Sequence, residues 1–405
     1  MSYKTFTAGD ILTAAQVNEF LMDQAVMAFP DSGARGSAIT LPTDGMMSYL
    51  QDTNVIEQYR TSGTAVAAWE PVSPGLGNLL INGDFAINQR AFTSTTSGNY
   101  GFDRWLVGNS GGTVTYSAQT FTPGAAPVAG YEARNHARLV TSGQSAAGDY
   151  ALICQRIEDV RTLAGQTATV SFWAKAASGT PKIAVEVEQN FGSGGSPSAT
   201  VAIYAGQVTL TTSWARYYVS VAVPSITGKT IGTTANTSYV ASNLFVSAGS
   251  DFNSRTGTLG VQTGTFDLWG VQVERGTVAS PFRTATGTLQ GELAACQRYY
   301  QVLASGNTNF VMAGHGYATT GGVFAYSFPV PFRSGTLTMT LSSASHFKTF
   351  LANGTDASIT ALTSTNLTSR NARIDITVAS GLSVGQAVLL ISQNASAFLA
   401  FSAEL

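Results

Sequence analysis

Short segments in which apolar and polar residues alternate recur through the middle of the chain, and they constrain its fold most strongly. Residues 166–175 and 183–188 place an apolar side chain at every second position, and residues 214–223 continue the pattern. Successive side chains of a strand point to opposite faces, so each segment predicts a strand with one face in a core. Glycine, serine and threonine turns separate the segments, which is typical of a β-sandwich or jelly roll.

The composition supports a mainly β fold and restricts the classes of function. Charged residues make up 11% of the 405 residues, less than half of the usual quarter, and 42 glycines together with many serines and threonines take their place. This mixture suits turns and β-surfaces and gives helices little support. The net charge is −2 and the few lysines form no basic stripe, so we expect no nucleic-acid partner.

The chain carries no sequence signal for secretion or membrane insertion. No apolar segment follows Lys4, and the long apolar run at 387–391 has the length of a strand. Cys154 and Cys296 form no disulfide framework, which leaves either one bridge between them or two buried free thiols. We expect synthesis in a cytoplasm and no membrane insertion, with any surface role arising through assembly.

A helix signal stands near the start of the chain. Thr13 is a predicted N-cap, and Gln16 completes a capping box. The apolar stripe that follows, and that ends before Pro30, comprises Val17, Phe20, Leu21, Ala25 and Ala28. A lone helix of this length is marginal in water, so the stripe packs either onto its own domain or against other copies around a symmetry axis.

Turn and linker signals divide the rest of the chain. Residues 39–72 predict a small β-meander, and a linker follows at 73–77. Leu289, Leu293 and Cys296 have helical spacing and lead into a strand-like segment. The predicted domains are an N-terminal helix plus β-meander (1–75), a central jelly-roll β-sandwich (76–286) and a C-terminal β-sandwich (287–405).

Three groups of motifs resemble proteins of bacteriophage tails. Pro-Thr-Asp-Gly-Met at 42–46 and Trp-Glu-Pro-Val at 69–72 resemble N-terminal attachment regions. The segments at 78–85 and 266–282 resemble the first and last strands of carbohydrate-binding-module-like jelly rolls. Glu-Leu-Ala-Ala-Cys-Gln-Arg-Tyr-Tyr at 292–300 resembles the entry to the distal β-sandwich of tail fibres.

The order of these motifs resembles that of bacteriophage tail fibre or receptor-binding proteins. The resemblance implies a homotrimer in the virion, synthesised in the host cytoplasm, that docks through its N-terminus on other tail or baseplate proteins. It implies binding of host surface glycan or protein without catalysis. A glycan depolymerase of the tailspike kind and a purely structural tail or baseplate subunit are the alternatives.

Glycan binding needs an aromatic ring beside hydrogen-bonding side chains on a concave β-surface. Trp173 lies on the strand face opposite the predicted core set of Val170, Phe172 and Ala174. The candidate glycan-binding residues, expected on neighbouring strands of one face, are Trp173, Glu186, Glu188, Gln189 and Tyr204. The alternative is that Trp173 packs beneath a loop or against another subunit. Glu186 and Glu188 are also the pair that hydrolysis would use, although a solvated polar face is the simpler interpretation.

The resemblance implies no cofactor except, as an option, a structural calcium ion between the first and last strands. Asp84 and Asp267 stand at comparable positions. An Asx-turn at 82–84 and an ordinary edge aspartate are the alternative. The three histidines have no neighbours at ligand spacing, so we expect neither a zinc site nor a catalytic residue.

The predicted homotrimer can be tested directly. The N-terminal stripe lacks surrounding strands that would receive it, and association would bury it. Light scattering on the purified protein should give about three times the chain mass of 42.2 kDa. A molecular mass equal to that of one chain at micromolar concentration would contradict the predicted homotrimer.

Overall fold

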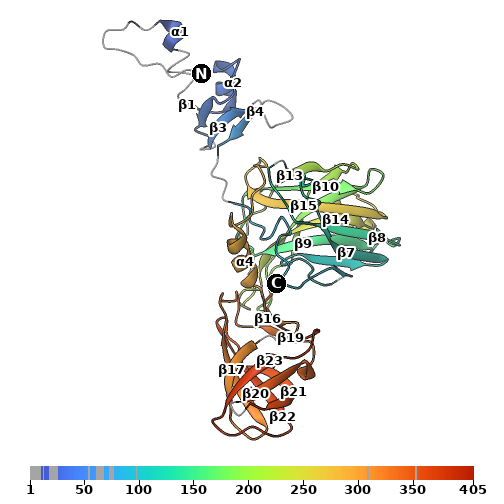
Figure 1. Cartoon of the computed structure of the whole chain (residues 1–405). Helices are drawn as coiled ribbons and strands as arrows, with labels where there is room; N and C mark the ends of the chain where they lie inside the picture. The colour runs from blue at the N-terminus through green and yellow to red at the C-terminus, as the bar shows by residue number, and fades with distance from the viewer. Residues whose placement is uncertain are drawn as a thin grey trace. The chain divides into compact units, whose positions relative to one another are not determined.

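The computed structural model describes residue 11 and residues 13–17, 26–52, 55–60, 68–72, 77–96, 98–128, 130–307, 310–351 and 354–405. The chain divides into two units, Met1–Leu76 and Gly77–Leu405 (Figure 1). The described part is mainly β, as predicted, with several antiparallel sheets and few helices. None of its helices is long and apolar enough to cross a membrane.

The first unit contains the predicted β-meander. Its elements are α1 (Ala14–Val17), β1 (Val26–Phe29), α2 (Ser32–Ala38), β2 (Met47–Leu50), β3 (Val55–Arg60) and β4 (Ala68–Pro71). Strands β2, β3 and β4 pair antiparallel, and β1 adds to the edge in parallel with β2. Helix α2 has Asp31 as its N-cap, whose side chain accepts a hydrogen bond from the Ala34 amide at 2.7 Å.

The prediction that the N-terminal helix extends to Ala28 is wrong. Val17 lies in α1, but Ala28 lies in β1 and pairs with Tyr49 of β2. The edge of the meander offers backbone partners to Val26 and Phe29, residue types that favour strands, and this tertiary pairing overrides the helical spacing. Phe20, Leu21 and Ala25 lie outside the described residues.

Two sheets enclose the first core of the second unit (Figure 1). The six-stranded sheet has the order β13 (Ala215–Ala222), β10 (Thr167–Ala176), β15 (Gly264–Arg275), β8 (Asn135–Ser142), β7 (Thr113–Thr120) and β5 (Ser94–Thr95). The five-stranded sheet has the order β12 (Val201–Thr209), β11 (Lys182–Asn190), β14 (Tyr239–Ala248), β9 (Tyr150–Ile157) and β6 (Leu106–Ser110). The predicted core face of Val170, Phe172 and Ala174 is confirmed, because all three are fully buried between the sheets.

The segment that was expected to be the first strand joins β15 through the side chain of Asn78 and through backbone hydrogen bonds, one of them from the Leu79 amide to the Val273 oxygen at 2.9 Å. Asn78 Oδ1 accepts hydrogen bonds from the Val273 amide at 3.0 Å and the Leu80 amide at 2.9 Å, and Asn78 Nδ2 donates to the Val271 oxygen at 2.9 Å. The Val271 amide in turn donates to the Gly83 oxygen at 2.9 Å. Residues 78–85 therefore follow β15 without forming a regular strand. The backbones approach so closely that a Cβ on Gly83 would lie 2.1 Å from the Val271 oxygen.

The C-terminal part begins with the predicted helix and continues into strands. Its elements are α4 (Leu289–Gln297), β16 (Tyr300–Ser305), β17 (Phe310–Gly316), β18 (Gly321–Ser327), β19 (Thr338–Leu341), η3 (Ala344–His346), β20 (Phe347–Leu351), β21 (Asp356–Thr365), β22 (Asn371–Val378), β23 (Ala387–Ser392) and β24 (Phe398–Ser402). Strands β17, β18, β22, β21, β20 and β23 close into a barrel, and β16, β24 and β19 form a separate sheet. The predicted two-sheet sandwich thus takes the form of a barrel plus a three-stranded sheet.

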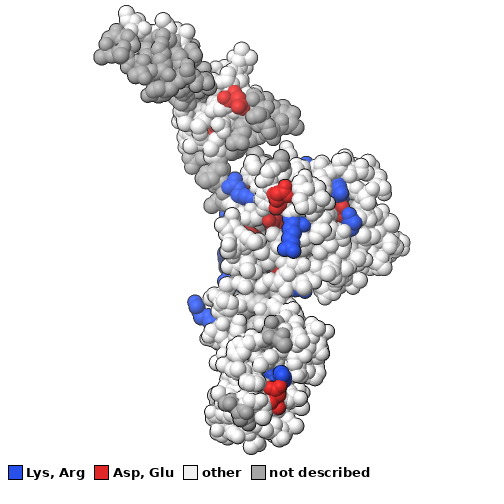
Figure 2. All heavy atoms as spheres, viewed as in Figure 1, with Lys and Arg blue, Asp and Glu red and all other residues white. Residues whose placement is uncertain are grey.

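Charges on the described surface are sparse. On the face drawn in Figure 2, Lys and Arg residues occur in small groups, several of them beside Asp or Glu. Cys154 and Cys296 are both free and buried, so the second of the two cysteine alternatives is confirmed.

Gly83→Ala should destabilise the second unit. The added Cβ would collide with the Val271 backbone oxygen, which cannot move without breaking the contact between residues 78–85 and β15. We expect a loss of about 3 kcal/mol in urea unfolding of the full chain followed by tryptophan fluorescence. Gly148→Ala is the matched control, since its Cβ would lie at an ordinary 3.5 Å from Asp251. Equal stability of the two variants would contradict this packing.

Candidate functional site

The outward face of the five-stranded sheet carries a groove of about 420 Å³. Strands β6, β9, β14 and β11 form its floor. A turn made of η2 (Ser250–Phe252) and α3 (Asn253–Thr256) contributes side chains to its lining. In the antiparallel register, outward-facing side chains of adjacent strands lie directly opposite one another and form rows across the sheet. The polarity of the groove surface differs between these rows.

One end of the groove is apolar and aromatic. Leu152 of β9 stands opposite Phe245 of β14, and Gly108 of β6 stands on the other side of Leu152. The ring of Phe252 lies 5.0 Å from that of Tyr150 and 6.0 Å from that of Phe245, measured between centroids. This end offers apolar surface with ring edges and faces, to which the C–H face of a sugar can pack.

In the middle of the groove, the lining residue Arg255 pairs with a carboxylate that is buried. Glu186 is fully buried, and its carboxylate accepts hydrogen bonds from Arg255 Nε at 2.6 Å and Arg255 Nη2 at 2.7 Å. Asn243 Nδ2 donates a further hydrogen bond to Glu186 Oε1 at 2.8 Å. The carboxylate is therefore neutralised and solvated by protein groups.

The other end of the groove is polar and contains the carboxylate of Glu188 and the guanidinium of Arg156. Arg156 and Glu188 stand on either side of Ala241, whose small side chain leaves space between them. Among the residues that the structure describes, Glu188 makes only long contacts of 3.4 Å, to Arg255 Nη2 and to the Tyr239 hydroxyl. Burial, followed by the charge of Glu186, raises the pKa of Glu188 above its usual range, although Arg255 and Arg156 oppose the shift.

The structure separates Trp173 from the other candidate glycan-binding residues. Trp173 lies on β10 of the six-stranded sheet, whereas Glu186 and Glu188 lie on β11 of the five-stranded sheet, so the prediction of one shared face is wrong. Trp173 and Phe282 both lie over Gly270, and the indole N–H of Trp173 is buried without a hydrogen-bond partner. This is the alternative in which Trp173 packs beneath a loop.

Gln189 and Tyr204 also lie apart from the groove lining. Gln189 is buried and donates a hydrogen bond to the Pro224 oxygen at 3.0 Å, because its position in β11 puts it on the opposite face from Glu188. Its predicted place beside Glu188 on one face is therefore wrong. Tyr204 of β12 stands opposite Glu186 in the register and packs against Gly257 at the end of α3.

The two aspartates of the expected calcium site are engaged by different partners. Asp267 accepts hydrogen bonds from Arg138 Nε at 2.7 Å and Nη2 at 2.9 Å. Burial acts to raise the pKa of Asp267, but Arg138 and His136 outweigh it and lower the pKa to about 2. Asp84 accepts a hydrogen bond from the Tyr131 hydroxyl at 2.9 Å, and burial raises its pKa. Within the described residues, no three His, Cys, Asp or Glu side chains gather where they could hold a metal ion.

Several residues of the groove were not predicted from the sequence. On β9, the side chains at every second position from Tyr150 to Arg156 point outward. This spacing could have identified Arg156 as a residue on the outward face of a strand. Phe252 and Arg255 lie on η2 and α3, which are too short to give a periodic signal. Their place over the sheet depends on contacts between segments far apart in the chain, such as Arg255 with Glu186.

No protein-family model and no curated protein sequence matches the chain. Among solved structures, the enzymatically active domain of bacteriophage CBA120 tailspike protein 4 is similar at 15% identity, covering 49% of this chain and 21% of that chain, with a TM-score of 0.28. The CBM22-2 xylan-binding domain of Paenibacillus barcinonensis Xyn10C is similar at 17% identity, covering 44% and 94%, with a TM-score of 0.28.

A third similar structure is the family 11 carbohydrate-binding module from Clostridium thermocellum in complex with a β-1,3-1,4-mixed-linked tetrasaccharide. Its identity is 10%, the match covers 47% of this chain and 99% of that chain, and the TM-score is 0.28. At these identities and TM-scores, the matches assign neither a ligand nor an activity to this chain.

The raised pKa of Glu188 predicts how the change Glu188→Gln alters the stability of the chain. Because the folded-state pKa of Glu188 is raised, its ionised form costs stability, and this cost appears as the pH rises through that pKa. At pH 7 we expect the variant to be at least as stable as wild type in urea unfolding, with the difference disappearing toward about pH 4.

The exposed Glu132, whose Oε2 accepts a hydrogen bond from the Gly124 amide, gives the control Glu132→Gln. This control should leave the stability at pH 7 within about 0.5 kcal/mol of that of wild type. A Glu188→Gln variant that is clearly less stable than wild type at pH 7 would contradict the raised pKa of Glu188.

Proposed function

We propose that this chain is a bacteriophage tail fibre or receptor-binding protein whose jelly-roll groove binds glycan of the host cell envelope. The observation that carries the proposal is the combination, in one groove, of the aromatic end at Tyr150 and Phe252 with the polar end at Arg156 and Glu188. A sugar ring has the matching chemistry, with an apolar C–H face and a rim of hydroxyl groups. The volume of about 420 Å³ lies within the range of small-ligand sites.

In this proposal, each end of the groove has its own role. A sugar ring packs its C–H face on Tyr150 beside Leu152 and Phe252. Hydroxyl groups of the same or the next sugar donate to the Glu188 carboxylate and accept from the Arg156 guanidinium. In the described part of the chain, Glu188 makes only contacts of 3.4 Å, and Arg156 uses Nη1 for a hydrogen bond to the Leu405 oxygen, which leaves its other N–H groups for ligand hydroxyls.

We further propose that the protein binds glycan without cleaving it. Hydrolysis would need two carboxyl groups free to act as an acid and as a base or nucleophile. Glu186 is fully buried, and Arg255 and Asn243 occupy its oxygens. The pair of Glu186 and Glu188 is therefore better suited to binding than to proton transfer.

The role in the virion rests on the order of the sequence motifs. In the proposal, the first unit attaches the protein to the tail tip or baseplate, and the protein is made in the host cytoplasm and assembled as a homotrimer. Three grooves on one fibre would raise the avidity of individually weak glycan contacts. Host surface protein remains the alternative receptor in this scheme.

Filling the apolar end of the groove tests the proposed site. A Cβ on Gly108 would make ordinary contacts of 3.4 Å to Leu152 and 3.5 Å to Tyr150, so Gly108→Val should fold while its methyl groups enter the groove. Isothermal titration of the full chain against glycans released from host envelopes should show binding to wild type. The variant should bind at least about tenfold more weakly, because it displaces the sugar ring.

Gly335→Val is the matched control, since a Cβ there would also meet its neighbours at ordinary distances of 3.6 Å or more. It should bind as wild type does. Wild-type affinity in Gly108→Val would exclude the groove as the site, and the absence of binding by wild type to every envelope glycan would overturn the proposed function. Release of sugar from the envelope preparations would instead favour a depolymerase.

A further inference from the structure

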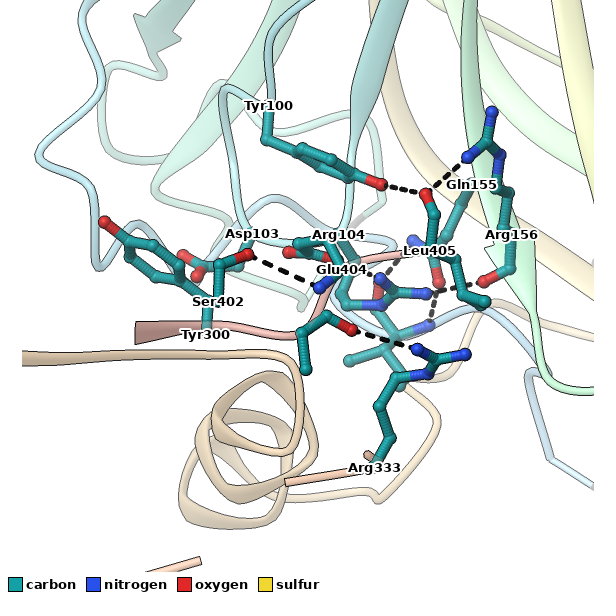
Figure 3. A network of polar contacts seen from close by, with 12 residues as sticks. Tyr100, Asp103, Arg104, Gln155, Arg156, Tyr300, Arg333, Ser402, Glu404 and Leu405 are labelled. Carbon is teal, nitrogen blue, oxygen red and sulfur yellow. Dashed lines mark hydrogen bonds and ion pairs between the residues drawn. The ribbon is translucent and has the colours of Figure 1, made fainter. Parts of the chain in front are cut away.

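The last residues of the chain contact the jelly roll, and one of these contacts is with Arg156, which lines the groove (Figure 3). Glu404 follows β24 and forms ion pairs with Arg104 and Arg90, the latter at 3.1 Å. The backbone oxygen of Leu405 accepts hydrogen bonds from the Tyr100 hydroxyl at 2.8 Å and from Arg156 Nη1. We call these contacts the junction network.

Arg104 is the buried centre of the junction network. Its side chain is 1% exposed, and its guanidinium carbon lies 3.4 Å from the centroid of the Tyr299 ring. Burial acts to lower the pKa of Arg104, but the charge of Glu404 outweighs it and raises the pKa overall. Arg104 therefore stays charged, and it needs Glu404 as its counter-ion.

Arg156 joins the junction network to the groove. Its backbone oxygen accepts a hydrogen bond from Arg104 Nη2 at 2.6 Å, and its side chain donates to Leu405. The same guanidinium lies over the Tyr239 ring, 4.7 Å from the centroid, and lines the groove opposite Glu188. Both the backbone and the side chain of Arg156 are thus held by groups that depend on residues 404–405.

We propose that Glu404 and Leu405 are positioning residues of the groove, which hold Arg156 in the conformation that meets the ligand. This inference rests on the proposed function of the groove. A free arginine side chain has many rotamers, and holding it in place beforehand lowers the entropy lost when a ligand binds. The binding unit then includes the end of the C-terminal part, and ligand binding and the junction stabilise one another reciprocally.

A double-mutant cycle separates positioning from general stability. Wild type, Arg156→Ala, Glu404→Gln and the double variant are compared as full chains, by isothermal titration with one envelope glycan that wild type binds. We expect each single variant to bind about fivefold to tenfold more weakly. The double variant should bind no more weakly than Arg156→Ala, because Glu404 acts through Arg156.

Asp356→Asn is the matched acid-to-amide control, since Asp356 pairs with Lys348 on the barrel surface at 2.5 Å and its side chain is 43% exposed. It should leave the affinity unchanged. Near-ultraviolet circular dichroism checks the fold of every variant. If Glu404→Gln fails to fold, Tyr100→Phe replaces it, since this change removes one donor to Leu405 and leaves the ion pairs intact.

The outcomes distinguish the two claims. Wild-type affinity in a folded Glu404→Gln or Tyr100→Phe variant, or additive losses in the double variant, would overturn the positioning role while leaving glycan binding in place. Failure of wild type to bind any envelope glycan would overturn the proposed function, and the positioning role with it. A loss in Glu404→Gln that disappears in the Arg156→Ala background would support both.

Discussion

The burial of one cation, Arg104, constrains the whole second unit. A charged guanidinium removed from water requires a counter-ion. Within the described part of the jelly roll no acidic side chain pairs with Arg104, whereas Glu404 of the C-terminal part does. Glu158 reinforces the same boundary through Arg298 and Arg333, at 2.9 Å each. The jelly roll and the C-terminal part are therefore joined by charge pairs whose separation would leave buried charge unpaired.

The same junction contacts one of the two residues of the groove's polar end, Arg156. Strand register places Arg156 and Glu188 on either side of Ala241, and Arg104 and Leu405 of the junction network hold Arg156 by hydrogen bonds. The groove thereby combines an apolar end, which is a property of the sheet and of Phe252, with a polar end that depends on a distant segment. The polar end of the groove therefore depends on two parts of the chain, because the jelly roll provides Arg156 and the C-terminal part contacts it.

Local patterns predicted much of the fold and little of the site. Alternation identified β10, β11 and β13, and the buried face that contains Phe172, because a strand's two faces can be read from its own sequence. The pairing of strands cannot be read locally, and so Trp173 was expected beside Glu188 although the two lie on different sheets. Ala28 is a second example. Its segment has helical spacing, but it forms a strand because it pairs with the neighbouring strand β2.

Hydrogen exchange of the full chain, with and without a bound envelope glycan, tests the central claim most directly. If the groove is the glycan site, backbone amides of Tyr150–Ile157 and Tyr239–Ala248, which form its floor, should gain protection on binding. Amides of Phe398–Ser402 should gain protection with them through the junction network. Protection confined to the barrel strands, or to the sheet that carries Trp173, would contradict the assignment of the groove.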